Sequence, residues 1–246
     1  MAIPQYLAMT GAEFRQSDSL PQQIGWMACH FSPYSTGLSN LPPTLPPDSL
    51  LILNDRIPMG GRQDFAFIAQ ELTQCLEENR CCGLLLDFQR RNISQNAALA
   101  GYLVRNLRAS VIVSAMYAED LSCPVFLPPV SPDRPVDTCL EDWQGREVWL
   151  ELSLCPEQLV LTQSGVVSPP GEVPVPEAGF SHEGLCCHYC VKAAADSVTF
   201  TRWRTPEDNR ALLQKAEGLG VVGAVGLFQE WQRMQLPQSQ KDGELS

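Results

Sequence analysis

Hydrophobic residues along this chain fall into short continuous runs that alternate with segments of helical periodicity. Such apolar runs of roughly four to eight residues are typical of parallel strands buried on both faces. We predict strands at residues 24–29, 50–53, 83–88, 111–117, 124–127, 148–152 and 221–228. Hydrophobic residues spaced by three or four positions, together with a capping signal at the last segment, predict helices at residues 64–79, 94–107 and 205–217. The alternation of strands and helices indicates a parallel sheet covered by helices.

One segment, residues 155–197, breaks this rhythm. Its four prolines at 169, 170, 174 and 176 exclude a long helix, and the patterns at 159–162 and 189–191 are typical of hairpin strands. We therefore expect an insertion of antiparallel strands and loop, after which residues 198–203 return to the core. Residues 1–246 are interpreted as one domain, and the polar residues 235–246 as a disordered tail.

Composition and charge limit the classes of partner. The 246 residues can bury a sizeable core, and their net charge of −11 argues against binding to nucleic acid or to an anionic membrane. Residues 1–16 lack the pattern of a signal peptide, and no apolar run approaches the roughly 20 residues of a membrane span. The ten cysteines are then expected as reduced thiols in a cytoplasmic protein. The oligomeric state is not predicted.

The most informative run is residues 82–89, Cys-Gly-Leu-Leu-Leu-Asp-Phe-Gln. It is an apolar strand that ends in an acid, Asp87, and an amide, Gln89. Polar groups at the carboxyl ends of parallel strands occupy the positions where barrel enzymes keep their chemistry. We therefore take this strand end as the centre of the candidate site.

Two segments resemble family 18 glycoside hydrolases, the chitinase-like (β/α)8 barrels, and especially their bacterial spore-associated members. The first is residues 82–89. The second spans 198–231 and contains Phe200-Thr201-Arg202-Trp203, the helix start Thr205-Pro206-Glu207-Asp208, the break Gly218-Leu219-Gly220 and the run at 223–228. The resemblance covers about a third of the chain and implies a (β/α)8-type barrel with a small antiparallel β insertion. Our count of seven or eight strands leaves a reduced or distorted barrel open, and residues 83–88 form the third predicted strand, whereas the family's motif lies on the fourth.

Carried over position by position, the family motif Asp-x-x-Asp-x-Asp-x-Glu falls on Cys82, Leu85, Asp87 and Gln89. In the family the terminal Glu protonates the leaving oxygen and the middle Asp orients the acetamido group of the substrate. A glutamine has no titrating proton to deliver, and general acid catalysis is typically worth about 10²–10⁴-fold. The resemblance therefore implies a bacterial pseudoenzyme that binds an N-acetylglucosamine-containing glycan without hydrolysing it by that route.

A carbohydrate groove needs polar groups for hydroxyls and aromatic faces for sugar rings. The residues we predict to bind the ligand are Asp87, Gln89, Tyr117, Trp203, Phe228 and Trp231. In the resemblance, Phe228 falls where the family often has the tryptophan that floors a sugar subsite. The alternative is structural: Asp87 then satisfies backbone groups at the strand end or pairs with Arg90.

Other acids near predicted strand ends leave a hydrolase open as an alternative. The candidate catalytic residues are Asp55, Asp87, Glu119 and Glu151, with Glu230 as a further acid of the same kind. Two of them close together would provide a conventional pair of carboxylates. His30, after the first predicted strand, is a candidate general base. A third reading is a structural or assembly protein without a small-molecule site.

A cluster of cysteines and histidines lies at residues 182–190 and includes one Cys-x-x-Cys, formed by Cys187 and Cys190. A structural zinc site usually pairs two such elements, and the sequence has no second Cys-x-x-Cys, so the pattern favours a strand over a metal site. No phosphate-binding loop or nucleophile elbow occurs. We therefore predict no metal and no cofactor.

Overall fold

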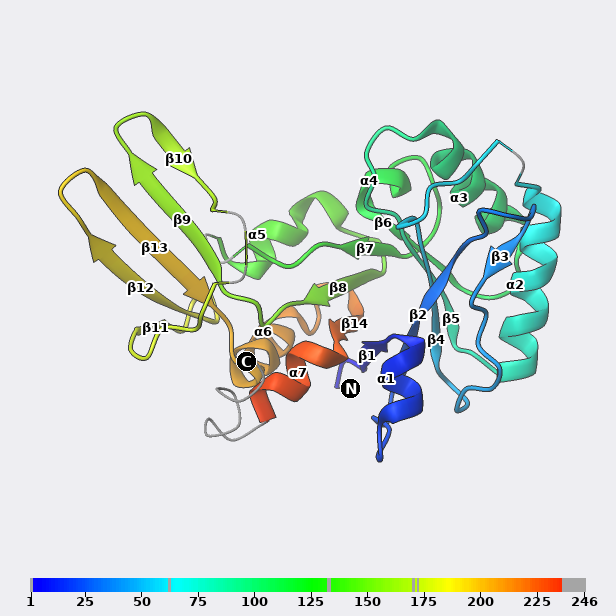
Figure 1. Ribbon diagram of the computed structural model, residues 1–246, viewed down its shortest axis with the longest axis horizontal. Coiled ribbons are helices and arrows are strands. Elements are labelled where there is room, and N and C mark those ends of the chain that lie inside the picture. Colours follow the sequence, from blue (N-terminus) through cyan, green and yellow to red (C-terminus); the bar gives the residue numbers. More distant parts are fainter. Residues whose placement is uncertain (1, 62, 132–133, 170, 172, 236–246) are drawn as a thin grey trace.

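The computed structural model describes every residue except 1, 62, 132–133, 170, 172 and 236–246. All but the first residue of the predicted tail thus lies outside the described residues. The described chain forms a barrel from which a second, antiparallel sheet projects (Figure 1).

Eight parallel strands close into the barrel, because β1 pairs with both β2 and β14. In chain order they are β1 (Gln5–Met9), β2 (Ile24–Phe31), β4 (Leu50–Asn54), β5 (Gly83–Asp87), β6 (Val111–Ser114), β7 (Val125–Leu127), β8 (Val148–Leu152) and β14 (Val221–Leu227). The two-residue strand β3 (Leu38–Ser39) extends the sheet antiparallel to β2. The predicted (β/α)8-type barrel is confirmed, and its ring of strands is complete.

The strand that the sequence pattern missed is β1. Its apolar run, Tyr6 to Met9, is only four residues long and contains no β-branched residue. With β1 included, β5 is the fourth barrel strand, and our count of third was wrong. The fourth strand is the one that carries the motif in family 18 glycoside hydrolases.

The helices vary greatly in length, and those after β6 and β7 are short. They are α1 (Gly11–Gln16), α2 (Phe65–Asn79), α3 (Ser94–Asn106), α4 (Ala115–Ala118), α5 (Val136–Leu140), the 3₁₀ turn η1 (Glu141–Trp143), α6 (Pro206–Ala216) and α7 (Phe228–Gln235). The predicted helix start at Thr205 is a capping box in which the side chains of Thr205 and Asp208 each bind the other's backbone amide. Two strand predictions ran too far, because residues 115–117 belong to α4 and Phe228 begins α7.

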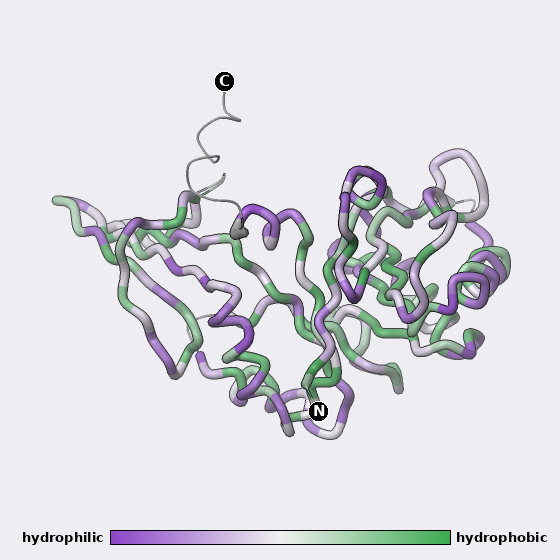
Figure 2. Tube along the Cα trace, turned by 90° about the horizontal axis from the view of Figure 1, so that it is seen from below, coloured by the Kyte–Doolittle hydropathy of each residue, from purple (hydrophilic) through white to green (hydrophobic). Residues whose placement is uncertain are grey.

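Two layers of buried side chains follow from the period of two along each strand. The barrel interior holds Tyr6, Ala8, Leu50, Ile52, Leu85, Ile112, Phe126 and Val225. Their strand neighbours, such as Leu84, Leu86 and Leu150, point outward into the larger core beneath the helices. Hydrophobic positions accordingly concentrate in the strands, and hydrophilic ones in the loops and outer turns (Figure 2).

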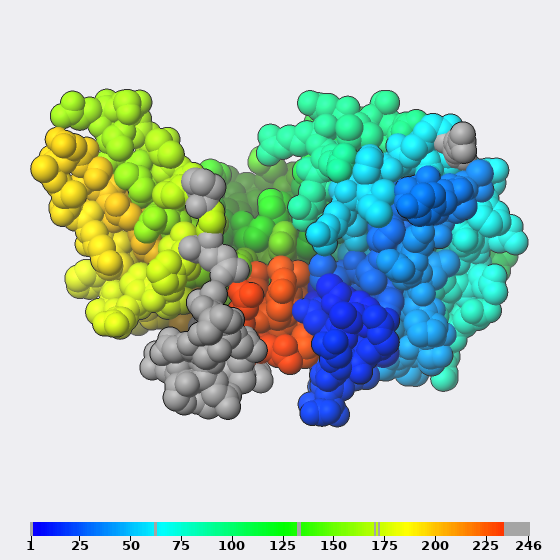
Figure 3. All heavy atoms as spheres, viewed as in Figure 1, coloured from blue at the N-terminus to red at the C-terminus, as the bar shows by residue number. Residues whose placement is uncertain are grey.

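The predicted insertion is a five-stranded antiparallel sheet in the order β10-β9-β13-β12-β11. Its strands are β9 (Glu157–Thr162), β10 (Gly165–Val167), β11 (Phe180–His182), β12 (Cys187–Ala193) and β13 (Ser197–Trp203). We expected residues 198–203 to return to the core, but β13 pairs with β9 and β12 along its length and extends the insertion to Trp203. The space-filling view shows a hollow between this sheet and the barrel (Figure 3).

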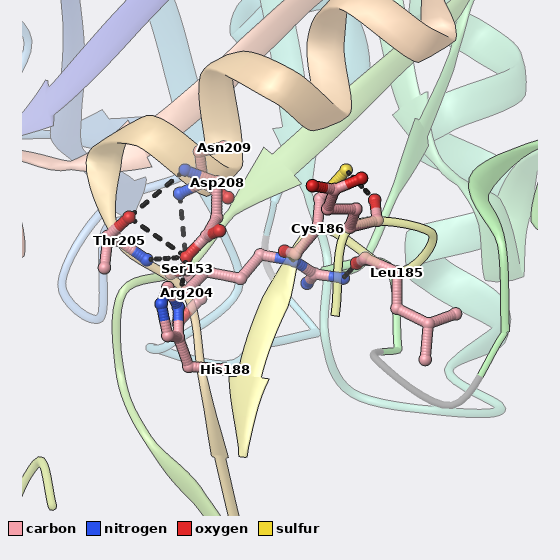
Figure 4. Close-up of polar contacts among 9 residues, drawn as sticks. Ser153, Leu185, Cys186, His188, Arg204, Thr205, Asp208 and Asn209 are labelled. Atoms are coloured by element: carbon pink, nitrogen blue, oxygen red, sulfur yellow. Dashed lines mark hydrogen bonds and ion pairs between the residues drawn. The ribbon is translucent and has the colours of Figure 1, made fainter. Parts of the chain in front are cut away.

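Two contacts fix the antiparallel sheet to α6 and the barrel (Figure 4). The buried Arg204 donates to three backbone carbonyls, those of Cys186 at 3.0 Å, Val130 at 2.5 Å and Leu185 at 3.4 Å. On β12, His188 Nδ1 lies 2.8 Å from Asp208 Oδ2 in the first turn of α6, and its ring stacks on Trp203. A buried guanidinium satisfied by carbonyls orients the insertion on the barrel.

Candidate active site

Asp87 and Glu151 both point into the barrel at the carboxyl end of its strands. Asp87 follows the interior residue Leu85 by two positions on β5. On β8, Val148, Leu150 and Leu152 face outward, which places Glu151 on the interior side. Two strands on different sides of the ring therefore supply two carboxyl groups to one space.

The pKa shifts of the two acids are consistent with this placement. Burial, together with the neighbouring charges of Asp87 and Glu230, raises the pKa of Glu151 to about 7. Burial also raises the pKa of Asp87, an effect that the Gln89 hydrogen bond opposes. Near neutral pH the Glu151 carboxyl therefore readily carries a proton.

Gln89 is hydrogen-bonded to the acid that precedes it by two positions. Its Nε2 lies 3.3 Å from Asp87 Oδ1 and 3.4 Å from Asp87 Oδ2. An amide can donate in this way, whereas an ionised glutamate at position 89 would repel the carboxylate. The amide thus stabilises the charged form of Asp87 at the mouth of the barrel.

Asp55, at the end of β4, has a structural place under the loop that carries Gln89. It is 3% exposed, and its carboxylate accepts from the backbone amides of Gln89 and Arg90 at 3.0 Å each and from Asn96 Nδ2 at 2.8 Å. These three bonds fix the turn after β5. Because the Asp55 carboxylate is used in these bonds, Asp87 and Glu151 are the two remaining candidate acids at the strand ends.

A cleft of about 890 Å³ opens at the carboxyl ends of β1, β2, β4 and β5. Its lining includes Asp87, Gln89, Asp55 and His30 together with residues from the loop after β3, from α1 and from the turns after β4 and β5. His30 uses both ring nitrogens, since Nδ1 lies 2.9 Å from the carbonyl oxygen of Phe31 and Nε2 lies 3.0 Å from Asn40 Nδ2. A carbonyl only accepts and an amide nitrogen only donates, so this arrangement requires the hydrogen on Nδ1.

The remaining predicted site residues lie outside the lining of this cleft. Tyr117, on α4, bonds through its hydroxyl to the backbone of Ile93 and Arg90 and so braces the turn after β5. Trp203 is buried in the antiparallel sheet, where it stacks on His188. Glu119 is exposed after α4 and does not lie at the end of β6, which is Ser114.

The aromatic residues after β14 and the acid between them lie on α7. Phe228 is buried against Met9 and Ile24. Trp231 is partly buried beside Gly226, where a β-carbon would come within 2.6 Å of its Nε1. Glu230 accepts from the backbone amide of Leu154 at 2.7 Å and fixes the segment after β8. The charge of Glu230 contributes to the raised pKa of Glu151.

Several residues that line the cleft were not among the predicted site residues. Thr10, Gly11 and Arg15 lie at the end of β1 and on α1. Asn54 and Arg56 lie at and after the end of β4. The Thr10-x-x-Glu13 capping box at the start of α1 is the signal that would have located that helix and the strand before it.

The described residues contain no group of three or more His, Cys, Asp and Glu side chains placed to hold a metal ion. The segment 182–190 forms β11, a turn and β12, and all ten cysteines are free thiols. Among the described helices, none is both long and apolar enough to cross a membrane.

Comparison with solved structures places this fold among chitinase-like barrels. A glycoside hydrolase family 18 N-acetylglucosaminidase from Paenibacillus barengoltzii matches with a TM-score of 0.57 at 9% identity, over 91% of this chain and 94% of that one. A mutant class V chitinase from Nicotiana tobaccum in complex with NAG4 matches with a TM-score of 0.57 at 10% identity, over 92% and 93%. A chitinase-like agglutinin from Robinia pseudoacacia matches with a TM-score of 0.59 at 10% identity, over 90% and 93%.

These matches extend over nearly the whole chain and show that it has the family 18-like TIM-barrel fold. No protein-family model matches the sequence, and no curated protein does. The similarity to these structures is therefore one of fold.

Proposed function

We propose that this protein binds an N-acetylglucosamine-containing glycan at the carboxyl ends of its barrel strands and does not hydrolyse it through residue 89. The observation that carries the proposal is the Asp87–Gln89 pair, hydrogen-bonded at the end of the fourth barrel strand and lining an open cleft. The pair offers one ionisable acceptor and one amide, which suits a sugar hydroxyl or acetamido group. The chitinase fold supports this class of ligand.

The cleft also weighs against an assembly protein without a small-molecule site. Its volume of about 890 Å³ lies within the range of ligand pockets. Its polar groups come from four adjacent strand ends, where barrel folds place their chemistry. A purely structural barrel has no need of an open polar space at this end.

Calorimetric titration with chitotetraose tests the proposal. We expect binding that weakens at least tenfold in the Asp87→Ala variant, because the sugar then loses its charged hydrogen-bond acceptor. The exposed Asp120→Ala variant is the matched control and should bind like the unmodified protein. Absence of heat at millimolar chitotetraose would overturn glycan binding.

A second candidate function, hydrolysis by other carboxylates, is favoured by one observation. Glu151 has a pKa of about 7, raised in part by the charge of Asp87, and a carboxyl that holds its proton near neutral pH together with a second carboxyl is the pair that glycosidases use. Asp55 is committed to three hydrogen bonds and Glu119 is exposed, so Glu151 is the acid to test.

Turnover of an aryl N-acetylglucosaminide separates the two functions. A hydrolase would release the aryl group with a rate that falls as pH rises through about 7 and that is lost in Glu151→Gln. A binding protein would retain affinity for chitotetraose without any release. The Gln89 amide transfers no proton in either case, because it has no titrating group.

A further inference from the structure

The cleft carries positive charge although the protein is strongly acidic. Its lining contains Arg15 from α1, Arg56 from the turn after β4 and Arg90 from the turn after β5. All three side chains are exposed, while the whole chain has a net charge of −11. Arginines gathered in one cleft of such a protein are the feature that requires explanation.

These guanidinium groups have no carboxylate partner among the described residues. The ion pairs there involve other side chains, namely His188–Asp208, Arg202–Glu157 and Arg210–Glu207. The two acids in the cleft lining are already bonded, Asp55 to three donors and Asp87 to Gln89. The three arginines therefore outnumber the acids and keep their charge for a ligand.

The main chain holds two of the three arginines next to each other. The Arg90 side chain donates to the backbone carbonyl of Arg56 at 3.1 Å, and the Arg90 backbone amide is fixed by Asp55 at 3.0 Å. Arg15 approaches from α1, with Nη1 3.3 Å from where a β-carbon on Gly11 would lie. Guanidinium groups on neighbouring turns can bind a planar carboxylate through paired hydrogen bonds.

We propose that the glycan bound in this cleft is acidic and that Arg56 and Arg90 bind its carboxylate groups, while the Asp87–Gln89 pair binds a neutral part of the same chain. This inference rests on the proposed function and specifies its ligand. The arginine positions favour an acidic glycan over neutral chitin, because a neutral chain offers no anionic group to pair with them.

The test compares two ligands that differ in charge alone. Chitotetraose and chitotetraose oxidised at C6 to carboxylates have the same length, linkages and acetamido groups. We expect the oxidised form to bind at least tenfold more tightly at 50 mM salt, and this advantage to shrink at 300 mM salt as the charges are screened. Calorimetry measures both affinities.

Variants locate the effect. Arg56→Gln and Arg90→Gln should each reduce affinity for the oxidised ligand about tenfold and leave the neutral ligand within about twofold. Arg108→Gln is the control, an exposed arginine that precedes β6 and so lies at the amino end of the barrel. Equal melting temperatures of all variants establish that the fold is intact. If Arg90→Gln fails to fold, Arg15→Gln takes its place.

The outcomes are separable. Equal affinity for the two ligands, or a charge preference that survives in both arginine variants, would overturn the acidic ligand and leave glycan binding standing. Binding of neither ligand would overturn the proposed function and this inference with it. Tighter binding of the oxidised form that is lost in Arg56→Gln and kept in Arg108→Gln would support both.

Discussion

Glu151 on β8 lies within electrostatic reach of Asp87 on β5, and the Asp87 charge adds to burial in raising the pKa of Glu151 from 4.5 to about 7. Unfolding releases Glu151 from both effects. Below pH 4.5 the group is protonated in both states, and above pH 7 it is charged in both. Its folded form therefore becomes progressively less favourable as the pH rises from about 4.5 to 7.

Glu151→Gln should remove this penalty. We expect the variant to gain stability over the unmodified protein by up to about 3 kcal/mol above pH 7, and the gain to vanish near pH 4, where Glu151 is already neutral. Urea unfolding at pH 4, 6 and 8 measures the difference. Glu119→Gln, an exposed acid after α4, should show no such trend. A stability difference that does not depend on pH would contradict the raised pKa of Glu151.

Restoring a carboxylate at position 89 should create a conflict with Asp87. In Gln89→Glu the amide that lies 3.3 Å from Asp87 Oδ1 becomes a second anion. We expect a loss of about 1 kcal/mol at pH 8, moderated by the exposure of residue 89, and recovery near pH 3 as one carboxyl takes up a proton. Melting temperatures at both pH values report it. Gln144→Glu, in an exposed turn, serves as control, and equal losses in the two variants would refute the interpretation.

Asp55 should matter for stability more than for ligand chemistry. Asp55→Ala leaves the backbone amides of Gln89 and Arg90 and the Asn96 side chain without their acceptor. Because Asp55 is 3% exposed, we expect a loss of about 3 kcal/mol in the free energy of unfolding. Guanidinium denaturation measures it, with exposed Asp120→Ala as the control. A loss below about 1 kcal/mol would show that the turn after β5 holds without Asp55.

The strand pattern predicted most of the barrel because seven of its strands carry an uninterrupted or nearly uninterrupted apolar run. The exception, β1, pairs with β2 on one side and with β14 on the other. Its sequence, Gln-Tyr-Leu-Ala-Met, contains no β-branched residue. The segment becomes a strand because it pairs with β2 and β14 and so closes the ring. This pairing depends on the tertiary structure and cannot be read from the local sequence.

The candidate site could be predicted in part for a similar reason. Asp87 and Gln89 are adjacent to a strong strand signal, so their position at the strand end follows from local pattern. That Glu151 faces Asp87 depends on which side of β8 points inward, and this is decided by packing around the whole barrel. Tyr117 was predicted at the end of a strand, but the chain forms α4 from Ala115 onward. Its hydroxyl therefore donates to the backbone carbonyl of Arg90.

The attachment of the antiparallel sheet provides the last prediction. Arg204 is 6% exposed, and its guanidinium is bonded to the carbonyls of Val130, Leu185 and Cys186, although burial lowers its pKa. Arg204→Met keeps much of the side-chain volume but leaves three carbonyls without a donor. We expect a loss of about 3 kcal/mol and faster hydrogen exchange in β12 and β13.

Arg202→Met is the matched control, since Arg202 lies on β13 two residues before Arg204 and its ion pair with Glu157 involves an exposed partner. Its loss should stay near or below about 1 kcal/mol. Hydrogen exchange resolved by segment distinguishes local release of the sheet from global unfolding, because the barrel strands β4 and β5 should keep their protection in Arg204→Met. Equal effects of the two variants would mean that the sheet is held by its own strand pairing and needs no anchor in Arg204.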